Sequence, residues 1–107
     1  DVPDALDLDA LAEMVALVQT MLGDCIEAFI NRDTEEATGL HSAFRELANL
    51  AQQTEEKFRG LLQDNMLPTE TAFEMSHLSQ RLLATGEQIA DVGNLVAHLH
   101  QGEQEES

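Results

Sequence analysis

Two carboxylates stand four residues apart near the end of the chain, in the stretch GEQIADVGNLVAHL (86–99). Glu87 and Asp91 would lie one turn apart on the same side of a helix. Such a pair can supply oxygen ligands to a hard cation, but a stable site needs about six ligands in total. No apolar pocket that would separate the pKa values of an acid and a base is evident, so catalysis is not predicted. We expect a solvated helix face here, with a weak metal site as the alternative.

The other residues with chemical potential are scattered. His98 and His100 are two residues apart, so on a helix their side chains diverge and cannot hold one metal ion together. His77 lies off the apolar stripe of its segment, and all three are expected at the surface. Cys25 is the only cysteine, which excludes an internal disulfide and favours a reducing compartment. It falls on an apolar stripe, where a thiol packs as a small hydrophobic group.

His41 suggests a different function, because an acidic helical bundle could be a histidine phosphotransfer domain. Such domains expose one histidine in the middle of a helix, usually with Lys three positions later and Gly four positions later. The stretch HSAFRE (41–46) places Phe44 and Arg45 there instead. These domains also need a fourth helix in the core. A phosphotransfer-like signalling domain that uses His41 therefore remains the alternative to a binding domain.

Length and charge narrow the classes of partner. The 107 residues suffice for one domain with a single core. There are 21 acidic residues against 5 scattered basic ones, for a net charge of −16. Nucleic acids and anionic membranes are not expected as partners, because both require clustered Lys and Arg. No apolar run is long enough to span a bilayer. The chain does not begin with Met, so we expect a processed chain or a domain of a larger protein.

Three segments repeat apolar residues at alternating steps of three and four, which is typical of long amphipathic helices. The predicted stripes are Leu8, Leu11, Val15, Val18, Leu22, Cys25 and Phe29; Ala37, Leu40, Phe44, Leu47, Ala51, Thr54, Phe58 and Leu61; and Met75, Leu78, Leu82, Thr85, Ile89, Val92, Val96 and Leu99. Further apolar residues lie beside these stripes, namely Met14, Leu17, Met21, Leu50 and Leu95. We expect a three-helix core to absorb this surplus, or the surplus to form a docking face.

The ends of the helices carry capping signals. Asp7 or Asp9 suits the start of the first helix, and Asp33 with Glu36 forms an acidic capping box for the second. A link of two or three residues between these helices requires an antiparallel hairpin. The stretch DNMLP (64–68) breaks the chain again, and Thr69 is predicted to cap the third helix.

The predicted fold is an all-α, antiparallel, up-down-up three-helix bundle of long helices spanning residues 1–102. Gly102 is predicted to end the third helix, and residues 103–107 are predicted to be a disordered acidic tail. Five glycines fall inside the helices, at a cost of about 1 kcal/mol each relative to Ala. Close backbone packing would explain some of them.

The sequence resembles one repeat of the PhoU family. The likeness begins in MVALVQTMLGDCIEAFINRDTEEA (14–37), with a Met-Leu pair at 21–22, Ala-Phe at 28–29, and the run from Asp33 to Ala37 that opens the second helix. It resumes in GEQIADVGNLVAHLHQG (86–102). The resemblance implies a cytoplasmic protein of three-helix bundles, usually two in tandem, that regulates phosphate uptake and signalling.

The metal motif of the family is incomplete in this chain. Family members that bind multinuclear metal clusters carry acidic pairs on the second and third helices. Glu87 and Asp91 match the third-helix pair, whereas the second-helix positions fall on Phe44 and Ala48. The resemblance therefore implies no required cofactor, with a divalent or transition metal at Glu87 and Asp91 as a weak candidate.

The resemblance implies a regulatory domain that acts by binding and is not an enzyme. The expected partners are proteins: a phosphate transporter, its sensor kinase or a sister PhoU repeat. The chain would act in the cytoplasm, beside the inner membrane where a transporter holds it but without inserting, or as the cytosolic domain of a sodium/phosphate cotransporter-like protein. We expect it to form a homo-oligomer or to be part of a larger chain.

Overall fold

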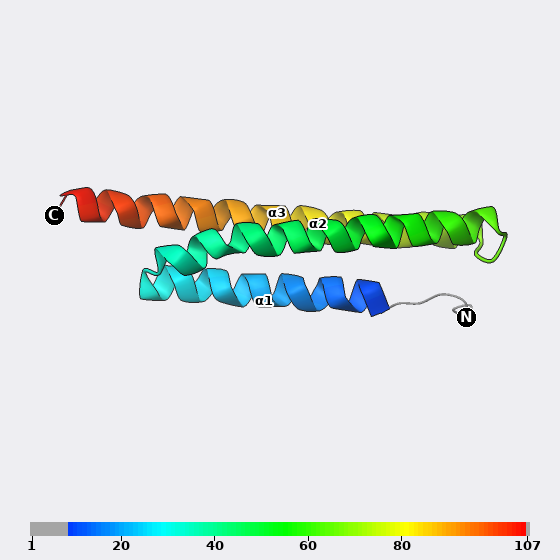
Figure 1. Ribbon diagram of the computed structural model, residues 1–107, viewed down its shortest axis with the longest axis horizontal. Helices are drawn as coiled ribbons and strands as arrows, with labels where there is room; N and C mark the ends of the chain where they lie inside the picture. The colour runs from blue at the N-terminus through cyan, green and yellow to red at the C-terminus, as the bar shows by residue number, and fades with distance from the viewer. Residues whose placement is uncertain (1–8, 107) are drawn as a thin grey trace.

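The structure, a computed structural model, describes the backbone of residues 9–106 and the side chains of residues 9–99. It consists of α1 (Asp9–Asn31), α2 (Thr34–Gln63) and α3 (Thr69–Glu106), which pack side by side in a bundle about 63 Å long and 17 Å wide (Figure 1). Each helix runs antiparallel to the one before it. The predicted all-α, up-down-up three-helix bundle is confirmed.

The turn between α1 and α2 contains only Arg32 and Asp33, as the capping signals predicted. Arg32 adopts a left-handed conformation with φ of 55°, and the Asp33 N–H donates to the Ala28 carbonyl at 3.0 Å. This pattern satisfies an otherwise free carbonyl at the end of α1. The Asp33 carboxylate accepts a 3.0 Å hydrogen bond from the Glu36 N–H, which caps α2. Because the Asp33 N–H is already used, Glu36 does not complete the reciprocal half of a capping box.

The turn between α2 and α3 closes in the same way. Asn65 has a φ of 58°, and the Met66 N–H donates to the Leu61 carbonyl at 2.9 Å. Asn tolerates this left-handed conformation better than most residues. The Pro68 carbonyl accepts the first helical hydrogen bond of α3, from Ala72 at 3.0 Å. Thr69 is thus the first residue inside α3. The capping position is held by Pro68, one residue before the predicted cap.

The outer ends of the bundle differ in part from the prediction. α1 begins at Asp9, while Asp7 and Leu8 lie outside the described residues. α3 continues through Gly102 to Glu106, so the predicted end of the helix at Gly102 is wrong. The disorder predicted for residues 103–107 stays a prediction. Gly102 ends a helix only where it turns left-handed, and no described glycine has a positive φ. Ser107 lies outside the described residues.

The apolar seam of α1 is turned relative to the prediction. Leu11 and Cys25 are buried as expected, but Met14 and Met21, which were assigned to a flank, are fully buried. The other buried residue of α1 is Ala28. Val15, Leu22 and Phe29 were predicted to lie in the core and are instead 39%, 51% and 61% exposed.

α3 is turned in the opposite sense, with Ser79 and Gly93 buried in place of Leu78 and Val92, whereas α2 matches the prediction well. Ile89 and Val96 are buried as predicted, but Leu78, Val92 and Leu99 are exposed. Their places in the seam are taken by small residues, namely Ala72, Ser79, Gly86 and Gly93. On α2 the buried residues are Ala37, Leu40, Leu47, Ala51, Thr54 and Phe58, all of which were predicted. Only α2 therefore buries the face that was predicted, whereas α1 and α3 are each rotated about their own axis.

Candidate functional site

Glu87 and Asp91 are both exposed on α3, and the opposing positions on α2 hold only hydrocarbon. Phe44 packs half-buried against the core. Ala48 lines a groove with Leu83, which lies one turn before Glu87. Neither α2 side chain can ligate a metal, so the donor set that a multinuclear cluster requires is not assembled here. The weaker alternative, a cation held by Glu87 and Asp91 alone, stays a prediction.

The histidines of α3 are placed at the surface, as predicted, where their side chains are described. His77 accepts a 3.1 Å hydrogen bond from Arg81 Nε. His98 Nδ1 lies 2.8 Å from the Asn94 carbonyl of its own helix. The side chain of His100 lies outside the described residues. Among the described side chains, neither His77 nor His98 belongs to a group of metal ligands.

His41 is exposed on the outer face of α2. Exposure is what a phosphotransfer histidine needs, but the surroundings differ from that class. The described part of the chain forms three helices and not the four-helix core of those domains. Phe44, three positions later, packs into the core and supplies no positive charge. The structure adds no observation that favours phosphotransfer.

Cys25 has the core position predicted for it. Its side chain is only 6% exposed, and Sγ lies 4.0 Å from the Ile89 carbonyl of α3. Burial raises the pKa of the Cys25 thiol. A protonated thiol is a poor nucleophile, so the residue packs α1 against α3.

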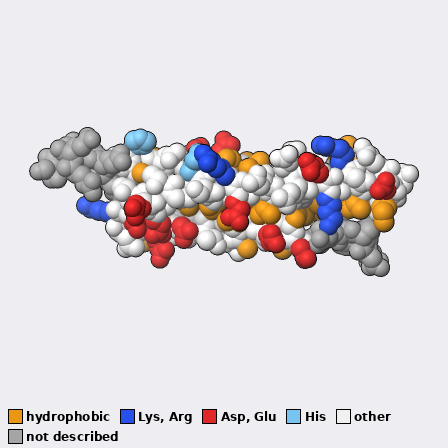
Figure 2. All heavy atoms as spheres, in the orientation of Figure 1, with side chains coloured by type: hydrophobic (Ala, Val, Ile, Leu, Met, Phe, Trp, Pro, Cys, Tyr) orange, Lys and Arg blue, Asp and Glu red, His pale blue; other side chains and the backbone are white. Residues whose placement is uncertain are grey.

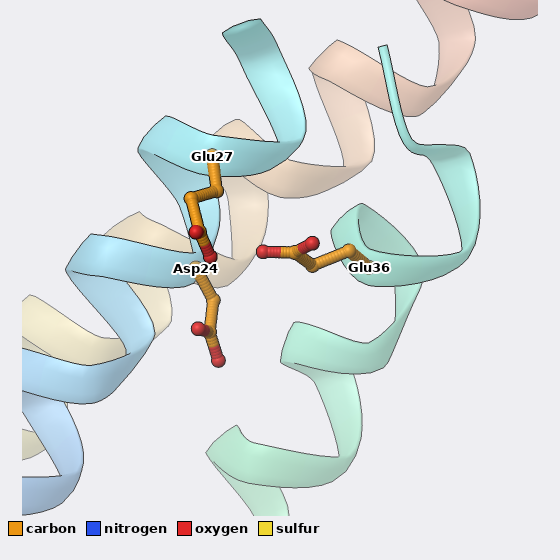
Figure 3. A group of neighbouring side chains, drawn as sticks. All are labelled: Asp24, Glu27 and Glu36. Atoms are coloured by element: carbon orange, nitrogen blue, oxygen red, sulfur yellow. The ribbon is translucent and has the colours of Figure 1, made fainter. Parts of the chain in front are cut away.

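An acidic cluster that the sequence analysis did not identify lies beside the turn between α1 and α2. Asp24 and Glu27 of α1 and Glu36 of α2 each place a carboxylate oxygen within 4.8 Å of the others (Figure 3). Glu36 points from the first turn of α2 toward the two α1 carboxylates. The signal was present, because a two-residue hairpin must bring the last turns of α1 beside the first turn of α2.

The electrostatics of this cluster centre on Glu36. Its Oε1 atom is shielded from water and has no hydrogen-bond partner among the described residues. The pKa of Glu36 is raised, first by loss of water and then by Glu27, through a hydrogen bond and like charge, with smaller effects of Asp24 and Asp33. Three carboxylates can share a proton or contribute to binding a cation, but they fall short of the six or more ligands that Ca²⁺ takes.

A further feature of the described surface is an apolar strip along α1 and α3. We define the α1–α3 strip as Val15, Leu22, Ile26, Phe29 and Ile30 of α1 with Leu78, Val92, Leu95 and Leu99 of α3, each between 39% and 71% exposed. Leu22 and Val92 line a common groove of about 160 Å³ between the two helices, with Cys25 and Ile89 at its base. Exposed apolar side chains gathered along two neighbouring helices are typical of interaction sites.

The rest of the described surface is predominantly acidic. Figure 2 shows Asp and Glu side chains along one face of the molecule, including a group beside the turn between α1 and α2. Within the described residues, no helix combines the length and apolar character needed to cross a membrane.

Comparison with known proteins identifies one family. The family model described as the PhoU domain matches residues 11–96, which include most of all three helices. No curated protein matches the chain significantly. No solved structure does so either.

Proposed function

Because the chain belongs to the PhoU family, we propose that it is a non-enzymatic domain that regulates phosphate uptake by binding another protein. The observation that carries the proposal is the match of the PhoU domain over residues 11–96. That membership supports a role in regulating phosphate uptake in general terms.

The positions of the candidate site residues support a binding function and not a catalytic one. Glu87, Asp91 and His41 are exposed on the outer faces of their helices, and Cys25 is buried in the core. The α1–α3 strip is the surface best suited to a macromolecular contact, because its side chains are apolar and water-exposed. Recognition through a helix face is the mechanism we assign.

The partner we propose is a phosphate transporter of the ATP-binding cassette class or the sensor kinase that acts with it. The domain would then work in the cytoplasm, at the membrane only through that partner. A cytosolic domain of a sodium/phosphate cotransporter-like protein would use the same strip. In each case the domain alters a partner's activity and needs no cofactor of its own.

The test is phosphate uptake in the source organism after deletion of this domain. Radiolabelled phosphate uptake is measured before and after a shift from low to high external phosphate. We expect wild-type cells to reduce uptake after the shift and the deletion strain to continue at the low-phosphate rate. An unchanged response in the deletion strain would refute the proposed function.

A further inference from the structure

α1 carries two apolar stripes side by side, and the structure buries only one of them. The buried residues, which we call the inner stripe of α1, are Met14, Met21 and Ala28. The outer stripe lies one position later along the chain and consists of the exposed residues Val15, Leu22 and Phe29. Both stripes have a spacing that suits a core-facing helix, so the sequence of α1 permits either face to be buried.

α3 carries a similar pair of stripes in the opposite order. Its inner stripe is buried and consists of the small residues Ser79, Gly86 and Gly93. Its outer stripe lies one position earlier along the chain and consists of the exposed residues Leu78, Thr85 and Val92. α1 and α3 point in the same direction along the bundle (Figure 1). Exchanging inner for outer stripes therefore requires the two helices to turn in opposite senses about their own axes.

Opposite rotation suits the contact between α1 and α3. When two neighbouring helices turn in opposite senses, their facing surfaces move in the same direction and do not slide past each other. Leu22 of α1 and Val92 of α3 line one groove, with the buried Cys25 and Ile89 at its base. Both would move inward together. Consecutive residues of an α-helix are about 100° apart, which sets the upper limit of the rotation.

The two packings gain stability in different ways. The outer stripes contain larger apolar side chains than the inner ones, so a packing that buries them removes more apolar surface from water. The described packing gains instead the close approach of Gly86 and Gly93 to α2. It also places the Thr54 and Ser79 hydroxyls 3.8 and 4.0 Å from the Met14 sulfur. Two packings of one sequence that trade such gains can be close in free energy.

The charged side chains near these stripes do not oppose the exchange. Asp24 and Glu27 of α1 place their carboxylates within 4.8 Å of Glu36 of α2 (Figure 3). By helical position they lie on the flank of α1 opposite its outer stripe, so the rotation carries them away from Glu36 and relieves like-charge repulsion. Arg81 borders the outer stripe of α3, but its Nε binds His77 at 3.1 Å. Its guanidinium can therefore stay in water in both packings.

We propose that α1 and α3 counter-rotate between the described packing, which exposes their outer stripes, and a second packing in which α2 covers them. The inference rests on the proposed function for the role of the α1–α3 strip as the recognition face. The second packing withdraws most of that face into the core of the same chain. The rotation would thus turn recognition of a partner on and off.

Neighbouring residues of α3 report the rotation, because the two packings exchange their exposure. Leu78 is 43% exposed and Ser79 is 1% exposed in the described packing. Leu78→Cys and Ser79→Cys are made singly, with Phe73→Cys as the reference, because Phe73 is 66% exposed on α3 and belongs to neither stripe. Alkylation by iodoacetamide is followed by mass spectrometry of the 107-residue chain, with and without sodium sulfate, which favours burial of apolar surface.

We expect sulfate to slow alkylation of Leu78→Cys and to accelerate that of Ser79→Cys, each by about threefold or more, with little change at Phe73→Cys. Ala28→Cys on α1 should accelerate together with Ser79→Cys, because the two helices turn together. Overall stabilisation of the described packing would accelerate neither buried site, and unfolding would not slow Leu78→Cys. Opposite changes at residues 78 and 79 are therefore specific to rotation.

A polar version of the outer stripes provides the second arm. Leu22→Gln with Val92→Gln, two residues that are exposed in the described packing, should abolish the effect of sulfate on both reporters. Met66→Gln is the matched control, since Met66 is 51% exposed in the turn between α2 and α3, and it should leave the effect intact. Circular dichroism verifies that every variant is folded.

Three results would overturn the proposal: changes in the same direction at residues 78 and 79, unchanged rates at both, or an exchange that persists in the double Gln variant. None of these measurements involves phosphate uptake, so a failure here is distinguishable from a failure of the proposed function.

Discussion

Gly86 of α3 lies so close to Leu47 of α2 that a methyl group on Gly86 would overlap the Leu47 side chain. Leu47 is fully buried in the core. Gly93, two turns later, stands in the same relation to Leu40, and an added Cβ would also lie 2.8 Å from the Ala37 carbonyl. These two glycines set how closely α2 and α3 approach, which explains their position in the seam despite their low helix propensity.

The first prediction concerns these glycines. Gly93→Ala is expected to destabilise the domain by about 1–3 kcal/mol, because overpacking outweighs the gain of about 1 kcal/mol in helix propensity. Gly86→Ala should act in the same direction. Gly23→Ala is the control, since nothing lies within 4 Å of its added methyl group, and it should stabilise by up to about 1 kcal/mol. Urea unfolding measures all three, and equal effects at Gly23 and Gly93 would contradict the packing described here.

The same glycines explain which part of the fold was predictable from sequence. The number of helices, their order and the Asp33 cap depend on local periodicity and capping chemistry, and each was predicted. The rotation of α1 depends on α3, because Met14 and Val15 begin two adjacent stripes that fit the same three-and-four spacing. In the structure Met21 of the first stripe lies against α3, with its Sδ 3.8 Å from where a Cβ on Gly86 would be. The long Met side chains fill the core, and the Val15 stripe faces outward.

The candidate sites were predictable to a different degree. Exposure of Glu87 was predicted, because it lies off the apolar stripe of its helix. The acidic cluster was missed, because its members come from two helices and Glu36 was assigned to a capping box. The Asp33 N–H donates instead to the Ala28 carbonyl, so the Glu36 side chain does not cap the helix and can join the acidic cluster. Of the residues predicted as surplus, only Leu95 belongs to the α1–α3 strip. The other members that the prediction named were assigned to the core, namely Val15, Leu22, Phe29, Leu78, Val92 and Leu99.

A second prediction concerns the cap of α2. Asp33→Ala removes the 3.0 Å hydrogen bond to the Glu36 N–H and is expected to cost about 1 kcal/mol of stability. Asp33→Asn keeps a side-chain oxygen as acceptor and should lie within about 0.5 kcal/mol of wild type. Thermal unfolding of the two variants provides the comparison. If Asn is as damaging as Ala, the hydrogen bond is not what the residue contributes.

A third prediction follows from the raised pKa of Glu36. The folded protein binds the proton more tightly than the unfolded chain, so ionised Glu36 opposes folding above its folded pKa, and acidification toward its unfolded value relieves this. Glu36→Gln should therefore raise the unfolding temperature at pH 7 and have less effect at pH 4. The control is Glu35→Gln, an exposed neighbour on the same turn. A Glu36→Gln effect that is the same at both pH values would show that no charge repulsion is relieved.

The fourth prediction addresses metals at Glu87 and Asp91. Because Phe44 and Ala48 provide no ligands, micromolar Fe²⁺, Zn²⁺ or Ni²⁺ should not raise the unfolding temperature through this pair. The double variant Glu87→Gln, Asp91→Asn should respond to each metal as wild type does. Stabilisation by a metal that disappears in the double variant would establish a site where the structure supplies only two carboxylates.

The most direct test of the central claim is phosphate uptake in cells whose only copy of the domain carries Leu22→Asp and Val92→Asp. Protein levels are matched by immunoblot, and Phe73→Asp is carried in a parallel strain. The account predicts that the strip variant fails to reduce uptake after a shift to high phosphate, as the deletion strain does, while Phe73→Asp responds like wild type. A normal response in the strip variant, alongside a defective deletion strain, would show that the domain regulates uptake through another surface.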